Sequence, residues 1–85
     1  MRDKLIDDTA THFVNHFEVK YGSYVKVAEP GEWRVIQLTQ LAALIVVDSV
    51  NAPGYSFWIP KTQLGFDPSE TLYVSKWFFE NKLHA

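Results

Sequence analysis

Two histidines four residues apart are the side chains best suited to metal chemistry. His12 and His16 fall on one face of a predicted helix with Asp8, and this spacing can bring two imidazoles to one metal ion. Residues 13–15 between them are Phe, Val and Asn, so the chain lacks the HExxH pattern of zinc peptidases. The alternative, which we favour, is a pair of solvent-facing histidines. We therefore expect no metal site and no cofactor.

The remaining reactive side chains show no catalytic arrangement. The carboxylates are dispersed, the serines lack a nucleophile-elbow context, and the four glycines are isolated rather than grouped in a phosphate-binding loop. There is no cysteine, so a thiolate nucleophile, a thiolate metal site and a disulfide framework are all excluded. An 85-residue chain with these features is not expected to be an enzyme. A net charge of −2 also argues against a protein that grips duplex DNA.

A short motif near the middle of the chain is the sharpest candidate for a binding surface. Trp58 and Pro60 could form a flat apolar platform, with Lys61 and Gln63 as polar contacts for a base or a peptide. The structural alternative is that Trp58 closes a barrel, Pro60 protects an edge, and Thr62 or Gln63 bonds the backbone of a turn. The predicted binding residues, for a protein or a nucleic acid, are Trp58, Pro60, Lys61, Gln63, Trp33 and Arg34.

An amphipathic helix is predicted over residues 3–17. Asp3 is its expected N-cap, and Gly22 is the expected stop signal, although the helix could end earlier. Spacings of four, three and four place the predicted buried face on Ile6, Ala10, Phe13 and Phe17.

The middle of the chain predicts short strands. These cover residues 23–29, 33–38, 42–47, 55–59 and 72–74, followed by a helix over 76–83 that Ser75 caps. Alternation in the fourth strand turns Phe57 and Ile59 inward and Trp58 outward.

Two connections decide how these strands are joined. We predict a turn at residues 39–40, although it lacks the usual Gly or Asn and a continuous bent strand is the alternative. Residues 65–70 are predicted to be a loop.

The expected fold is a single α+β domain over residues 1–85. It is a small antiparallel β-barrel, SH3-like or OB-like, of four to five strands with an N-terminal helix and a short C-terminal helix. Hydrophobic residues make up 47% of the chain and aromatic residues 15%, which is enough to build a core without disulfides.

The second half of the chain resembles a family of small, uncharacterised phage and prophage proteins. The resemblance covers roughly residues 33–83 and rests on a W-[IL]-P-K-[ST]-Q motif, here residues 58–63, followed by a V-x-x-W helix start at Val74 and Trp77. Thr62 stands where the family usually has serine, and the end of the chain is less basic than in family members. The resemblance implies an accessory protein of a mobile element with a short barrel and no catalytic activity.

These observations predict a cytoplasmic, non-enzymatic binding module that acts through a protein partner. The alternative is an OB-like protein that binds single-stranded nucleic acid through its aromatic residues and Lys26, Arg34 and Lys61. The partly apolar edges of the predicted strands are also compatible with a homodimer. The longest apolar run, residues 41–47, is too short to cross a membrane.

Overall fold

The described part of the chain forms short helices and six strands. The structure, a computed structural model, describes residues 1–9, 13–49 and 52–83. The helical elements are α1 (Arg2–Thr9), α2 (His16–Lys20), the 3-10 turn η1 (Lys61–Gln63), α3 (Lys76–Phe78) and the π-helical turn η2 (Phe79–Leu83). The strands are β1 (Tyr24–Ala28), β2 (Trp33–Leu38), β3 (Ala42–Ser49), β4 (Ala52–Pro60), β5 (Leu64–Phe66) and β6 (Leu72–Ser75).

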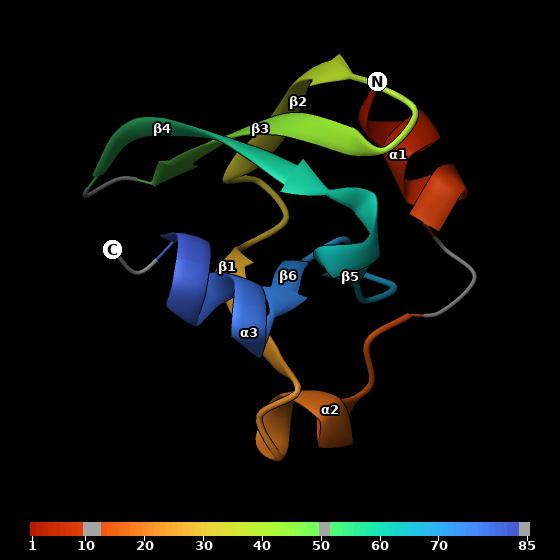
Figure 1. Ribbon diagram of the computed structural model, residues 1–85, viewed down its shortest axis with the longest axis vertical. Coiled ribbons are helices and arrows are strands. Elements are labelled where there is room, and N and C mark those ends of the chain that lie inside the picture. The colour runs from red at the N-terminus through yellow and green to blue at the C-terminus, as the bar shows by residue number, and fades with distance from the viewer. Residues whose placement is uncertain (10–12, 50–51, 84–85) are drawn as a thin grey trace.

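The strands form two separate antiparallel sheets of three strands each, with orders β1-β6-β5 and β2-β3-β4. In Figure 1 the β2-β3-β4 sheet lies above the other sheet, and α2 lies at the far end below both. The predicted barrel, SH3-like or OB-like, is therefore wrong, whereas the α+β class is correct. The chain leaves the upper sheet at Pro60, which has no N–H, and η1 carries it into the lower sheet instead of into a closing ladder.

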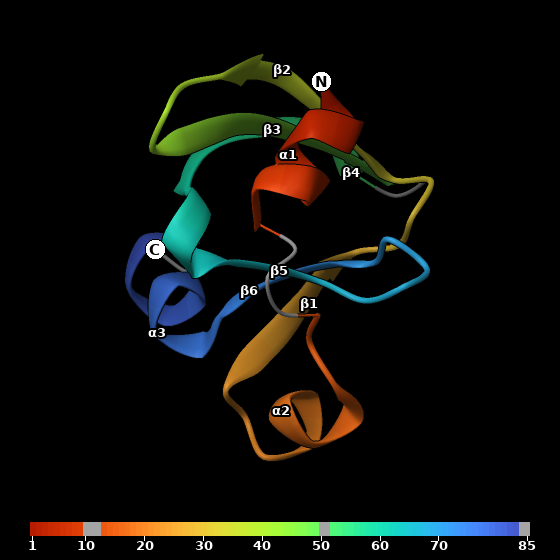
Figure 2. The ribbon, with the colours of Figure 1, turned by 90° about the vertical axis from the view of Figure 1, so that its right-hand side faces the viewer.

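The hydrophobic core lies between the two sheets. Ile45 of β3 and Ile59 of β4 face Leu72 and Val74 of β6, and all four side chains are fully buried. On one side α1 contributes the fully buried Leu5, and α3 contributes Phe78. Figure 2 shows α1 placed between the upper sheet and β5.

The predicted helix over residues 3–17 is wrong. It is broken into α1 and α2, and between them the backbone N–H of Val14 donates to the carbonyl of Phe66 at 2.8 Å, alongside β5. The Asn15 side chain starts α2 by accepting from the Glu18 N–H at 3.0 Å. The N-cap Asn15 thus marks the start of a separate second helix, and residues 13 and 14 before it are not helical.

The break also changes which residues of this segment are buried. Phe13 and Phe17 are 43% and 64% exposed, whereas Ile6 packs against the core beside the fully buried Leu5. Ala10 lies outside the described residues. The predicted stop signal is confirmed, because Gly22 follows α2 with a φ of +86°.

The strand predictions agree with the structure more closely than the prediction of the helix over residues 3–17. Strand 33–38 is observed with the same bounds, and the predicted turn after it joins β2 to β3 in a hairpin, so the alternative of a continuous bent strand is wrong. The side-chain hydroxyl of Thr39 accepts from the Ala42 N–H at 3.0 Å, which closes a turn that has no Gly or Asn. The predicted loop over 65–70 is wrong at its start, because Gly65 and Phe66 belong to β5.

No helix in the described ranges is long and apolar enough to cross a membrane.

Candidate functional site

The outer face of the β2-β3-β4 sheet carries the exposed tryptophan of the motif. Cross-strand pairing places Trp58 opposite Leu44, Ser56 opposite Val46, and Pro60 opposite Ala42. Side chains alternate along a strand, so these six residues share the face opposite the core. Inward-facing Ile59 is fully buried and Phe57 packs against the core, which confirms the predicted division between them and Trp58.

This outer face is apolar at one end and charged at the other. Trp58 is 48% exposed, and Leu41, in the turn beside Pro60, is 78% exposed. At the opposite end Arg34 pairs with Asp48 at 2.9 Å, and Val46, between Arg34 and Ser56 in the sheet, is buried. No described helix or strand lies over this face (Figures 1 and 2). We call the six residues above, with the Arg34–Asp48 pair, the outer sheet face.

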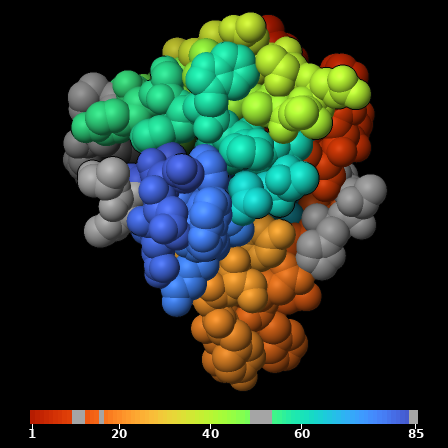
Figure 3. Space-filling view, viewed as in Figure 1, coloured from red at the N-terminus to blue at the C-terminus, as the bar shows by residue number. Residues whose placement is uncertain are grey.

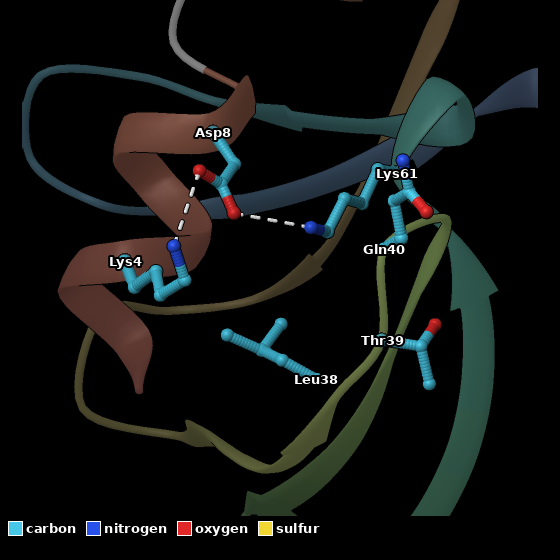
Figure 4. A pocket seen from close by; sticks show the side chains of 6 residues that line it. All are labelled: Lys4, Asp8, Leu38, Thr39, Gln40 and Lys61. Carbon is cyan, nitrogen blue, oxygen red and sulfur yellow. Dashed lines mark hydrogen bonds and ion pairs between the residues drawn. The ribbon is translucent and has the colours of Figure 1, made fainter.

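Lys61 points away from the outer sheet face, toward α1. Its ammonium group donates to the Asp8 carboxylate at 3.0 Å, and Lys4 lies 3.8 Å from the other carboxylate oxygen (Figure 4). With Leu38 and the β2–β3 turn, these side chains line a cavity of about 520 Å³. The Lys61 side chain is only 16% exposed, so it holds η1 against α1.

Asp8 balances part of the positive charge of this cluster. The hydrogen bond from Lys61, helped by the charge of Lys4, lowers the pKa of Asp8 below its ordinary value of 3.8. Asp8 is therefore ionised across the neutral range and compensates one of the two lysines. The cluster joins α1 to the connection after β4.

Gln63 also has a structural partner. Its side-chain oxygen accepts a hydrogen bond from the Ser75 hydroxyl, and the Ser75 oxygen in turn accepts from the Phe78 N–H at 3.2 Å. Ser75 is thus the N-cap of α3, as the sequence predicted, and Gln63 orients that cap.

Trp33 lies in the core and not on a surface. It is 4% exposed, stacks on Phe66 with ring centroids 5.3 Å apart, and donates from Nε1 to the Glu70 carbonyl at 2.8 Å. The Arg2 guanidinium lies 3.9 Å from its ring centroid and also pairs with the Glu70 carboxylate at 3.1 Å.

The structure therefore separates the six predicted binding residues. Trp58, Pro60 and Arg34 lie on the outer sheet face, whereas Lys61, Gln63 and Trp33 have structural partners. Sequence reasoning missed Leu41 and Leu44. The signal for both was the apolar run over residues 41–47, whose strand residues 42–47 are apolar on both faces and so indicated the centre of a barrel.

The histidine pair falls outside what the structure describes. His12 and the side chain of His16 are not among the described residues. Within the described residues no group of three metal-ligating side chains comes together.

A carboxylate organises the loop between β5 and β6. Oδ1 of Asp67 accepts from the backbone N–H groups of Ser69 and Thr71 at 2.9 and 3.0 Å, and Oδ2 accepts from the Tyr73 hydroxyl at 3.1 Å. Burial opposes ionisation of Asp67, but the bonds from Thr71, Tyr73 and Ser69 outweigh it and lower its pKa below 3.8. The loop holds Glu70, at a φ of +69°, where its carbonyl meets Trp33.

We expect this carboxylate to make the fold sensitive to acid. Its pKa is lower in the folded state, so its stabilisation is complete above about pH 5 and is lost as the pH falls through the folded pKa, below 3.8. Asp67→Asn, which turns an amide donor toward the Tyr73 hydroxyl, should cost about 1–2 kcal/mol at neutral pH. It should also flatten the loss of stability below pH 5 in urea titrations.

Tyr73→Phe serves as the control for that experiment. It removes one hydrogen bond and leaves the carboxylate in place, so an NMR titration should show the pKa of Asp67 move up toward 3.8. An Asp67 pKa at or above 3.8 in the unsubstituted protein would contradict the argument.

Comparison with known proteins finds no matching family model, no matching curated protein and no matching solved structure.

Proposed function

We propose that the chain is a non-catalytic module that binds a protein partner through the outer sheet face. The observation that carries this proposal is the placement of Trp58, half exposed and directly opposite Leu44, on a face that no other described element covers. Large apolar side chains on an uncovered sheet face lose contact with water when a partner binds, which favours association.

The arrangement has the features of a protein-binding surface. Tryptophan is enriched among the residues that dominate interface energetics, and such anchors work best when polar groups surround them. Here Leu44 and Pro60 flank Trp58, and the Arg34–Asp48 pair lies at one end of the face. All of these residues lie in strands of a three-stranded sheet, so the surface is formed before the partner arrives. The partner we expect presents an apolar side chain to Trp58 and a polar rim to the ion pair.

The contacts of the cationic residues weaken the nucleic-acid alternative. Lys26, Arg34 and Lys61 each form an ion pair, with Glu29, Asp48 and Asp8 respectively. Binding to single strands combines stacking on aromatic rings with free positive charge along the backbone. Trp58 supplies an aromatic ring for stacking, but the three cations proposed to contact the backbone are already paired with carboxylates.

Site-specific cross-linking tests the proposal. A photo-reactive amino acid at position 44 should capture a partner in a lysate of the source organism, and the same group at the exposed Ser69 should not. With the purified partner, Trp58→Ala should weaken binding by about 30-fold or more, equivalent to about 2 kcal/mol.

Trp77→Ala is the matched control, because Trp77 is 59% exposed but lies on α3, outside the outer sheet face. We expect it to bind the partner with unchanged affinity. Equal capture from positions 44 and 69, or full affinity after Trp58→Ala, would rule out this surface.

A further inference from the structure

Strand β4 forms one edge of its sheet. The order β2-β3-β4 leaves β4 bonded to β3 on one side only. Figure 3 shows side chains of this part of the chain at the surface, next to those of α3. The free side of β4 has no partner strand among the described residues, so its backbone groups are not paired within the sheet.

One hydrogen bond establishes which residues of β4 face that free side. The Lys61 N–H donates to the Leu41 carbonyl at 2.9 Å, so this pair is hydrogen-bonded across the β3–β4 ladder. Hydrogen-bonded and non-hydrogen-bonded pairs alternate in an antiparallel ladder. Ile59 and Phe57 therefore bond to β3, and in the regular part of the ladder the outward-facing positions are Ser56, Trp58 and Pro60.

Pro60 lies at a position that makes no hydrogen bond to β3, so its missing N–H removes no bond from the sheet. A proline is tolerated in a strand where the lost donor would face away from the ladder. The same proline limits the free edge, because an added strand can bond its carbonyl but finds no donor there.

The edge carries no charge. No residue between Ser49 and Pro60 is charged, whereas exposed edge strands commonly carry lysine or another charge that discourages pairing. Tyr55 is 58% exposed and stacks on Phe57, with ring centroids 6.3 Å apart. A second copy of this strand would bring neither a repulsive charge nor a buried ion.

We infer that β4 pairs antiparallel with β4 of a second copy of the chain, with the two-fold axis at Phe57, to form a continuous six-stranded sheet. Phe57 lies midway between Ser56 and Trp58, the two outward-facing residues that have both a backbone donor and a backbone acceptor, so this register uses both of them on each copy. Ser56 of the first copy and Trp58 of the second copy exchange two backbone hydrogen bonds. Trp58 of the first copy and Ser56 of the second copy do the same.

The side chains are compatible with this register. The indole of Trp58 lies opposite the small Ser56 of the second copy, and the two tryptophans become diagonal neighbours, a separation that aromatic side chains can bridge. The outer sheet faces of the two copies then form one surface. The dimer goes beyond the proposed function, since either copy could bind a partner without it.

Amide exchange and sedimentation test the pairing on the unmodified chain. From micromolar to millimolar protein, sedimentation should change from monomer to dimer, and exchange of the Ser56 and Trp58 amides should slow by about tenfold or more. The Phe57 and Ile59 amides, which bond to β3, should stay protected throughout. A monomer at every concentration, or fast exchange at Ser56 and Trp58 throughout, would overturn the inference.

The register can be tested with single cysteines, because the chain has none of its own. A mixture of Ser56→Cys and Trp58→Cys should form a heterodisulfide faster than either variant forms a homodisulfide, since only the mixed pair lies directly opposite. Faster homodisulfide formation by Ser56→Cys would contradict the axis at Phe57. Ser69→Cys, in the β5–β6 loop, provides the background rate.

Discussion

Gly65→Ala is expected to destabilise the protein by about 3 kcal/mol, although it adds only one methyl group. A Cβ at this position in β5 would lie 2.3 Å from Cγ2 of Val14 and 3.0 Å from Cε1 of Tyr24. Val14 is buried and its N–H is bonded to Phe66, so it has little freedom to move away. Urea unfolding monitored by circular dichroism would measure the loss.

Two further variants separate this steric conflict from a general effect of losing glycine. Gly31→Ala meets no atom within 4 Å and should change stability by less than about 0.5 kcal/mol. Val14→Ala with Gly65→Ala should cost less than the sum of the single substitutions, because the shorter side chain vacates the space. Strict additivity, or a neutral Gly65→Ala, would mean that the segment before α2 does not press on β5.

Trp33→Ala is expected to have the largest effect of any tryptophan substitution, about 3–5 kcal/mol. It opens a cavity beside Phe66, leaves the Glu70 carbonyl without its donor and removes the ring beneath Arg2. Domains of this size are stable by only about 5–15 kcal/mol, so much of the folded population should be lost on moderate heating. Thermal and urea unfolding would show it directly.

Trp33→Phe and Trp58→Ala give the comparison that makes this result informative. The phenylalanine retains an aromatic ring but not the Nε1 donor, and should cost less than alanine. Trp58→Ala lies on the outer sheet face and should cost less than about 1 kcal/mol. Similar losses for Trp33→Ala and Trp58→Ala would contradict the distinction between a core and a surface tryptophan.

Local patterns predicted the strands well because alternation and turn chemistry are local properties. The bounds of β2, the hairpin at residues 39–41 and the outward direction of Trp58 all followed from neighbours in sequence. The helix over 3–17 failed because apolar spacing alone does not reveal that Val14 bonds to a strand roughly fifty residues later.

The site predictions failed where the partner is distant. Lys61 looked like a surface contact because Asp8, which holds it, is far away in the sequence. Trp33 was predicted to be a surface binding residue because its contacts with Arg2 and the Glu70 carbonyl also join residues distant in the sequence. Gly65 was predicted to be a loop residue, but it lies in a strand where other side chains pack closely against it.

The two sheets differ in how they can be assembled during folding. β2, β3 and β4 follow one another along the chain and pair through short connections, so their sheet can form from local contacts. The other sheet requires Tyr24 of β1 to meet Ser75 of β6 across roughly 50 residues, and closing so long a loop carries a larger entropic cost. We therefore expect the β2–β4 meander to form early and the β1–β6 pairing to limit the folding rate. Until that step is complete, Ile45 and Ile59 face water, and the slow closure defines the interval in which the chain is most prone to aggregate.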